Sequence, residues 1–166
     1  TEAVVNSRAY YTLGTAEALA LRTIEVYLDV LKRREMVTLA TNNLQAHLRM
    51  HDQIRLRSDQ GVGRTADSDQ AEARLALAQN NLYTEQVNLA DAEASFLSVT
   101  GRPADDLASP ASIKSSMPTD INSARQSVAS NNPLLKSAQA DVQAAEKQYE
   151  SAKSPFYPRF DAELAT

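Results

Sequence analysis

Two histidines, His47 and His51, are the residues of this chain whose type and spacing could bind a metal ion. They lie four positions apart, so on a helix both imidazole rings share one face and can supply two ligands. A zinc-protease helix has a glutamate directly after the first histidine, whereas this chain has Leu48 there. No third ligand is evident beside them. We therefore predict neither a metal site nor a cofactor.

The other polar residues form no pattern that is typical of an active site. Arg55, Arg57 and Arg64 cluster near the middle of the chain, but Asp52 and Asp59 lie among them, which favours a solvated face over an anion site. The sequence has no Gly-x-Ser-x-Gly elbow and no phosphate-binding glycine loop. It also has no cysteine, which excludes disulfides, thiolate metal sites and cysteine nucleophiles. We expect a protein that is not an enzyme.

Composition favours closely packed helices. Hydrophobic residues make up 43% of the 166 residues, but aromatic residues only 5%, and tryptophan is absent. The net charge is -4, with 17 basic and 21 acidic residues, which argues against nucleic-acid binding. No stretch approaches the roughly 18 apolar residues of a membrane-spanning helix, and residues 1–6 lack the features of a signal peptide. We expect a soluble chain, or one that lacks its targeting segment.

Glycine and proline mark the first long element. Residues 4–60 contain no proline and a single glycine, Gly14, while apolar residues recur at helical spacing. This pattern predicts one very long helix. Gly61 and Gly63 permit positive φ where it ends, so we predict a tight turn near residues 61–66.

A second helix is predicted over residues 67–99, where Thr65 or Asp67 can cap the first turn. It carries two apolar stripes, and two stripes indicate two packing partners, as in a ring or bundle of helices. The first stripe contains Ala71, Leu75, Ala78, Leu82, Leu89, Ala92, Phe96 and Val99, and the second contains Ala73, Leu77, Val87, Ala90, Ala94 and Leu97. We therefore predict a long antiparallel coiled-coil hairpin.

The rest of the chain predicts shorter elements within an all-α fold class. Asp120 can cap a short helix, and Asn132 followed by Pro133 is a strong start signal for another. Beyond that helix, from Phe156 to Leu164, apolar and polar residues alternate as they do in a strand. The predicted divisions are the hairpin at 1–100, a connector with a short helix at 101–131, a further helix at 132–154 and the start of a strand at 155–166.

The order and spacing of these landmarks resemble the TolC family of outer-membrane efflux and secretion proteins, over nearly the whole chain. The runs that carry the resemblance are IEVYLDVLKRREMVTLATNNL from Ile24, GVGRTADSDQAEARLALAQNNL from Gly61, FLSVTGRP from Phe96 and NNPLLKSAQADVQAAEKQYESAKSPFYPRF from Asn131. The resemblance implies a homotrimer with a shared β-barrel in the outer membrane and a long α-barrel in the periplasm. Each protomer has two similar halves, and this chain resembles the first half without its own strands. Residues 102–130 correspond to an equatorial belt.

The resemblance also implies two functional positions. The turn, Gly61, Val62, Gly63, Arg64 and Thr65, corresponds to the tip that docks a periplasmic adaptor, or membrane fusion protein; the alternative is an ordinary turn. Asp67 corresponds to an aspartate that helps close the periplasmic aperture. The alternative for Asp67 is a carboxylate stabilised by the helix dipole, which needs no partner.

The expected function is passive export driven by an inner-membrane transporter through the adaptor. The run from Gly61 favours the type I protein secretion branch over multidrug efflux. One alternative is a soluble coiled-coil scaffold or adaptor hairpin that binds partner helices. Another is a di-iron helical-bundle enzyme, which requires Glu-x-x-His pairs, and neither His47 nor His51 follows a glutamate at that spacing.

Overall fold

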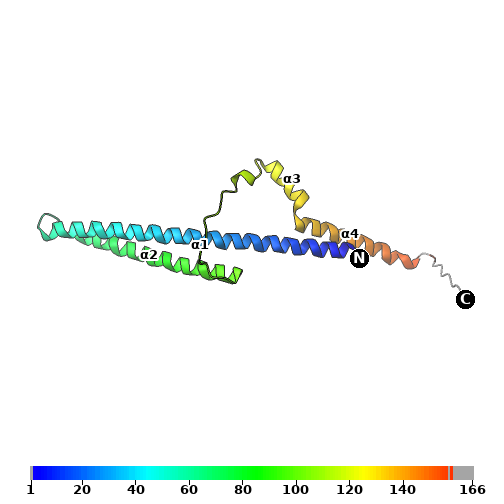
Figure 1. Cartoon of the computed structure of the whole chain (residues 1–166), viewed down its shortest axis with the longest axis horizontal. Helices are drawn as coiled ribbons and strands as arrows, with labels where there is room; N and C mark the ends of the chain where they lie inside the picture. The colour runs from blue at the N-terminus through cyan, green and yellow to red at the C-terminus, as the bar shows by residue number, and fades with distance from the viewer. Residues whose placement is uncertain (1, 157, 159–166) are drawn as a thin grey trace. The chain divides into compact units, whose positions relative to one another are not determined.

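The computed structural model describes residues 2–156 and 158, and these residues form helices joined by turns and one extended connector (Figure 1). The elements are α1 (Glu2–Asp59), α2 (Thr65–Thr100), η1 (Lys114–Ser116), α3 (Ile121–Asn131), α4 (Pro133–Lys153) and η2 (Ser154–Phe156). No strand occurs among the described residues, which confirms the all-α fold class. None of the described helices is both long enough and apolar enough to cross a membrane.

The described residues divide into two compact units. One contains residues 21–111, and the other contains residues up to 20 together with those from 112 onward. Helix α1 is 58 residues long, or about 87 Å at 1.5 Å per residue, and it contributes to both units. A helix this long has no interior of its own, so each unit must bury part of it against another element.

In the unit of residues 21–111, α2 runs back along α1 to form a helical hairpin (Figure 1). The buried residues of α2 all belong to the first predicted stripe, so this is the stripe that the hairpin buries; they are Ala71, Ala78, Ala92 and Phe96. Three of these four side chains are single methyl groups. Small side chains at the seam allow the two helix axes to approach closely.

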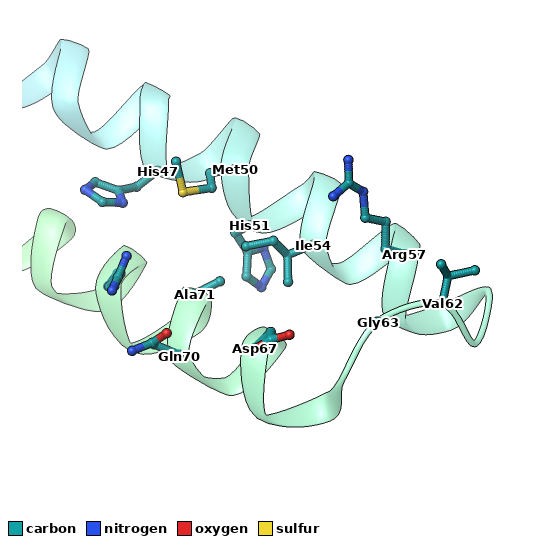
Figure 2. Close-up of a pocket in the computed structure, with 11 residues that line it drawn as sticks. His47, Met50, His51, Ile54, Arg57, Val62, Gly63, Asp67, Gln70 and Ala71 are labelled. Atoms are coloured by element: carbon teal, nitrogen blue, oxygen red, sulfur yellow. The ribbon is translucent and has the colours of Figure 1, made fainter.

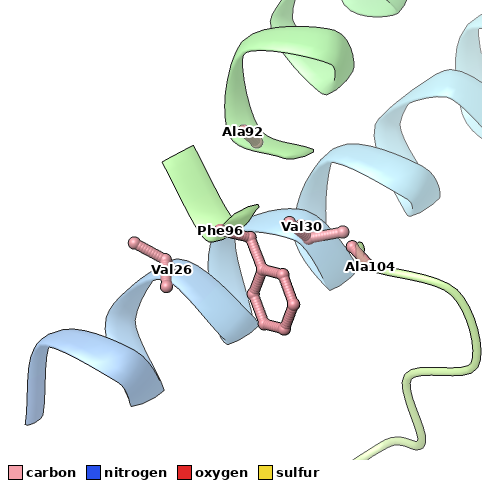
Figure 3. Packing of buried hydrophobic residues seen from close by; sticks show 5 residues of the cluster. All are labelled: Val26, Val30, Ala92, Phe96 and Ala104. Carbon is pink, nitrogen blue, oxygen red and sulfur yellow. The ribbon is translucent and has the colours of Figure 1, made fainter. Parts of the chain in front are cut away.

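The hairpin has its densest packing at the end away from the turn. There the core cluster consists of Val26, Val30, Ala92, Phe96 and Ala104 (Figure 3). Val30 is completely buried, at 0% exposure. The Tyr27 ring packs beside this cluster with its centroid 6.3 Å from that of Phe96. Among the described residues of the hairpin, Phe96 is thus the one aromatic side chain that is buried, at 7% exposure.

Arg34 fastens the start of the connector to the hairpin. Its guanidinium donates hydrogen bonds to the backbone carbonyls of Ala104 and Asp105 and lies 3.3 Å from the Glu93 carboxylate of α2. The Tyr27 hydroxyl donates a further hydrogen bond to the Ala108 carbonyl. Since these contacts are made to backbone oxygens, they satisfy carbonyls that a segment without secondary structure would otherwise leave without partners.

In the other unit, α4 packs along the first turns of α1 through small residues. The Ser137 hydroxyl donates to the Ser7 carbonyl at 3.0 Å, and both serines are buried. Ala140 is also buried. Gly14 lies under Leu134, and a Cβ built on that glycine would come within 2.6 Å of the leucine side chain. The absence of a side chain at Gly14 therefore permits the close approach.

The caps of the two short helices are those that the sequence predicts. The Asp120 carboxylate accepts hydrogen bonds from the amides of Asn122 and Ser123 at the start of α3. The Asn132 side chain accepts one from the Leu135 amide at the start of α4, with Pro133 in the first helical position.

Two other local predictions fare differently. Helix α2 has Arg64 at its N-cap position and no side-chain cap, so the predicted caps, Thr65 and Asp67, are wrong. A capping residue stands just before the first helical residue. Helix α2 begins at Thr65, so Thr65 is already inside the helix and Asp67 lies in its first turn. Of the predicted strand at 155–166, Phe156 lies in η2, and most of the remainder, from Phe160 to Leu164, lies outside the described residues.

Replacing Phe96 tests the seam. Phe96→Ala removes the only ring buried between α1 and α2 in the described hairpin and should lower the free energy of unfolding by about 3 kcal/mol. Leu97→Ala is the matched control, because Leu97 is half exposed and should cost less than about 1 kcal/mol. Urea unfolding followed by circular dichroism measures both. Equal losses would show that Phe96 does not hold the hairpin together.

The cap at Asp120 makes α3 sensitive to acid. Hydrogen bonds from Ser123 and then Asn122 lower the pKa of this carboxyl from its ordinary value of 3.8. The cap therefore stabilises α3 fully above that ordinary value, and the stabilisation is lost as pH falls through the lowered pKa. Hydrogen exchange of the Ser123 amide should accelerate, relative to its intrinsic rate, below about pH 3.8. Asp120→Asn keeps a capping side chain that does not titrate, so an identical pH dependence in that variant would contradict the assignment.

Candidate functional site

The turn between α1 and α2 is tight, and its backbone amides donate hydrogen bonds to the last carbonyls of α1. Residues 60–64 separate the two helices. The amides of Val62 and Gly63 both donate to the Arg57 carbonyl, at 3.0 and 3.1 Å, and the Gly61 amide donates to the Ser58 carbonyl at 2.9 Å. The last carbonyls of α1 thus find partners within the turn, as the end of a helix requires.

The two glycines of the turn are needed for different reasons. Gly61 has φ of 73°, in the left-handed region, although the space around its missing Cβ is open. Gly63 has no positive φ, but a Cβ there would lie 3.1 Å from the Ser58 nitrogen and 3.3 Å from the Arg57 carbonyl carbon. Backbone conformation therefore selects glycine at the first position, and close packing against backbone selects it at the second. Between them, Val62 is 80% exposed.

Beside the turn lies a cavity of about 340 Å³ between the ends of α1 and α2 (Figure 2). Its lining consists of His47, Met50, His51, Ile54 and Arg57 from α1, Val62 and Gly63 from the turn, and Asp67, Gln70, Ala71 and Arg74 from α2. Figure 2 shows His51 on α1 and Asp67 on α2, on the two helices that border this cavity.

The structure brings some of the predicted site residues together at this cavity. Val62, Gly63 and Asp67 line it, whereas Gly61, Arg64 and Thr65 lie in or next to the turn without lining it. Four further residues line the cavity that were not predicted as site residues: Met50 and Ile54 of α1, and Gln70 and Arg74 of α2. No sequence pattern links these positions, because they face one another only once the register of the hairpin is set.

The arginines near the turn differ in their surroundings. Arg55 lies 3.9 Å from the Asp59 carboxylate, with both side chains exposed, as expected for a solvated face. Arg57 lines the cavity but is exposed, as is Arg64. All three arginines are thus exposed to solvent, as predicted.

His47 and His51 share one face of α1, since both line the same cavity. The His51 ring nitrogen lies 3.5 Å from the neighbouring Asp52 carboxylate. Among the described residues, no group of three or more histidine, cysteine, aspartate or glutamate side chains is arranged to hold a metal ion.

The second predicted stripe of α2 lies on the outside of the hairpin. Leu77 is 60% exposed and Val87 is 61% exposed. Helix α1 has a comparable outer row of exposed apolar residues within this unit; it contains Leu21, Ile24, Leu28 and Leu39. Each helix thus has one apolar face in the seam and another open to solvent.

The chain is similar to the outer membrane efflux protein BepC of Brucella suis biovar 1 (strain 1330), with 31% identity over 127 residues, or 75% of this chain. The similarity supports a TolC-like channel part. The chain spans 27% of the length of that relative. A scan against protein-family models finds none that matches.

Proposed function

We propose that this chain is the periplasmic α-barrel portion of a trimeric outer-membrane channel. The observation that carries the proposal is the second apolar face of the hairpin, which includes Leu77 and Val87 of α2 and Leu28 of α1. Exposed apolar surface of this extent typically marks an interaction site. Helices with two apolar faces can pack on both sides, which a wall of helices requires.

A wall of such helices has a physical reason to close into a ring. A row of hairpins leaves an apolar face uncovered at each end, and closure covers both faces at once. The small seam residues, such as Ala71 and Ala78, keep neighbouring helices close. The solvent enclosed by the ring is the export path. Passage along it involves no catalysis, so the chain is proposed to act in transport without being an enzyme.

The turn is proposed to dock the periplasmic adaptor through Gly61, Val62, Gly63, Arg64 and Thr65. Two features support this role: Val62 is an apolar side chain that is mostly exposed at the apex, and a cavity opens directly beside it. The adaptor would connect the channel to the inner-membrane transporter that supplies the energy. The channel is proposed to serve multidrug efflux or type I protein secretion; the similar protein is named as an efflux protein, and the run from Gly61 favours type I secretion.

Altering the turn in the full-length protein tests the proposal. Gly63→Leu forces a side chain against the backbone of α1 and should reduce export at least tenfold while trimers still assemble. Gly101→Leu is the control for a strained glycine replacement outside the turn, because Gly101, unlike Gly63, has a left-handed φ of 71° and lies at the other end of α2. Drug susceptibility and the profile of secreted proteins measure export, and crosslinking measures trimers. Normal export by Gly63→Leu would contradict docking, and a monomeric wild-type protein would favour the scaffold alternative.

Asp67 is proposed to help hold the aperture closed through a basic residue elsewhere in the protein. Within the described part of the chain its carboxylate forms no ion pair, although it faces the cavity. Asp67→Ala should therefore raise the conductance of the closed full-length channel in planar bilayers, and Asp69→Ala, two residues further on, should not. Equal conductance in all three proteins would leave Asp67 with the helix-dipole role alone.

A further inference from the structure

Helix α2 carries a complete heptad row on the outside of the hairpin. From Ala73 to Leu97 this outer row of α2 advances in alternating steps of three and four residues without a break, which is the spacing of a coiled-coil seam. Every member is exposed, and Tyr83, Val87 and Leu97 are large apolar side chains. The members are Ala73, Ala76, Asn80, Tyr83, Val87, Ala90, Ala94 and Leu97. The described hairpin thus leaves this row uncovered.

The outer row of α1 lies in the same unit of the structure. Its aliphatic members Leu21, Ile24, Leu28 and Leu39 are exposed. Asn42 is exposed as well and follows Leu39 by three positions, so it lies on the same side of the helix. Each of the two outer rows therefore joins apolar side chains to an asparagine.

Packing inside the hairpin fixes which parts of the two outer rows stand at one level. Tyr27 of α1 packs against Phe96 of α2. Because α2 runs back along α1 (Figure 1), fifteen residues further along α1 and sixteen residues back along α2 reach one level, at Asn42 and Asn80. Counting from two ion pairs gives levels for Asn42 on either side of Asn80; these pairs are Arg33 with Glu85, and Arg34 with Glu93.

Neighbouring hairpins of a ring stand at equal height, because rotation about the ring axis does not shift them along it. Helix α1 of one hairpin then lies antiparallel to α2 of the next, with residues of equal level in contact. A leucine on an alanine lets the helix axes approach closely, and long charged side chains can lay their stems on apolar neighbours. Counted from the asparagines, the facing pairs are Leu28 with Ala94, Lys32 with Ala90, Glu35 with Val87, and Leu39 with Tyr83.

The asparagines distinguish this alignment from its nearest alternatives. At equal height Asn42 meets Asn80, and each carboxamide can donate and accept a hydrogen bond, so the two satisfy each other. A shift by one heptad would place Asn42 against Ala73 or Val87, whose side chains offer no hydrogen bond. An asparagine within a coiled-coil seam fixes alignment in this way, at a cost in stability.

We infer that the outer row of α2 receives the outer row of α1 from a neighbouring hairpin, antiparallel and at equal height, with Asn42 and Asn80 as the aligning pair. This inference rests on the proposed wall of hairpins and adds which faces meet and what sets their alignment. The contact joins two different faces. A hairpin that binds through one row therefore keeps the other for its next neighbour, as a ring requires.

The test uses the whole chain of 166 residues and takes a second copy as the neighbouring hairpin, because that copy carries the outer row of α1. The chain contains no cysteine, so Leu39→Cys and Tyr83→Cys in separate copies are the only thiols. Under mild oxidation this mixture should form crossed disulfide dimers at least fivefold faster than Leu39→Cys mixed with Gln79→Cys. Gln79 is the matched control, because it is exposed on α2 but lies outside the row.

Asn42→Val tests the alignment. At equal height this variant leaves Asn80 against an aliphatic side chain. A shift by one heptad instead places Asn80 at the level of Glu35 or Arg49, and either can bind its carboxamide. The variant should therefore still associate in sedimentation experiments, but in a shifted alignment.

Crosslinking detects the shift. In the Asn42→Val background, Leu39→Cys should crosslink to Ala76→Cys or Ala90→Cys, one heptad from Tyr83 on either side, at least as fast as to Tyr83→Cys. Without Asn42→Val, Tyr83→Cys should react fastest. Gln79→Val should leave this preference unchanged, and circular dichroism establishes that each variant keeps its helices.

The outcomes separate this inference from the proposed channel. A chain that stays monomeric up to its solubility limit, or crossed dimers that form no faster than with Gln79→Cys, would overturn the inference, while export by the full-length protein would still support the channel. An unchanged preference for Tyr83→Cys in Asn42→Val would overturn the aligning role of the asparagines. A full-length protein that forms no trimers would overturn the channel and this inference together.

Discussion

The hairpin depends on the close approach of two helices that are each too extended to be stable alone. Helix α1 has 58 residues and α2 has 36, and neither can bury apolar surface except against another element. Along their seam the buried side chains of α2 are mostly alanine, and Phe96 fills the one wider space beside Val26 and Val30. Since each alanine buries little apolar area, the stability of the hairpin must accumulate over many helical turns along the seam. A larger distance between the two helix axes would therefore weaken the packing along the whole seam.

This constraint accounts for both ends of the hairpin. At one end the helices must reverse direction without separating, and Gly63 allows the turn to pass directly over the backbone of Arg57 and Ser58. At the other end the connector leaves from between the same two helices, and Arg34 holds its carbonyls there. The cavity lined by Arg57, Val62 and Arg74 is the space that remains where the helices diverge to enter the turn.

The same seam explains why the outer faces matter for function. A helix that buries small residues on one side keeps room for leucine, isoleucine and valine on the other, and the structure leaves these outer residues exposed. The proposed channel uses them between hairpins, and the proposed docking uses the turn and the cavity. The similarity to an outer membrane efflux protein is consistent with both uses. Each use depends on surface that remains exposed in the folded hairpin.

The sequence by itself determined the features that depend on near neighbours along the chain. Periodicity placed the long helices and the two apolar stripes of α2, without showing which stripe the hairpin would bury, and short-range hydrogen bonding made Asp120 and Asn132 recognisable as caps. It also marked the two glycines of the turn, but only the folded hairpin shows that Gly63 is selected by packing rather than by φ. The failure to place the start of α2 has a similar origin, since several adjacent residues can cap a helix and the turn decides which one does.

Only the tertiary structure decided which residues meet across the seam. Arg34 lies against Glu93, fifty-nine positions away, and against Ala104, seventy positions away; no local pattern relates the members of either pair. Their meeting depends on the register between α1 and α2, which is fixed by the exact length of the turn and by how Phe96 fits against Val30. Helical periodicity fixes the face on which a residue lies, but it leaves the sliding of one helix along another undetermined. For this reason the helices followed from the sequence, while the charged cavity and the fastening of the connector did not.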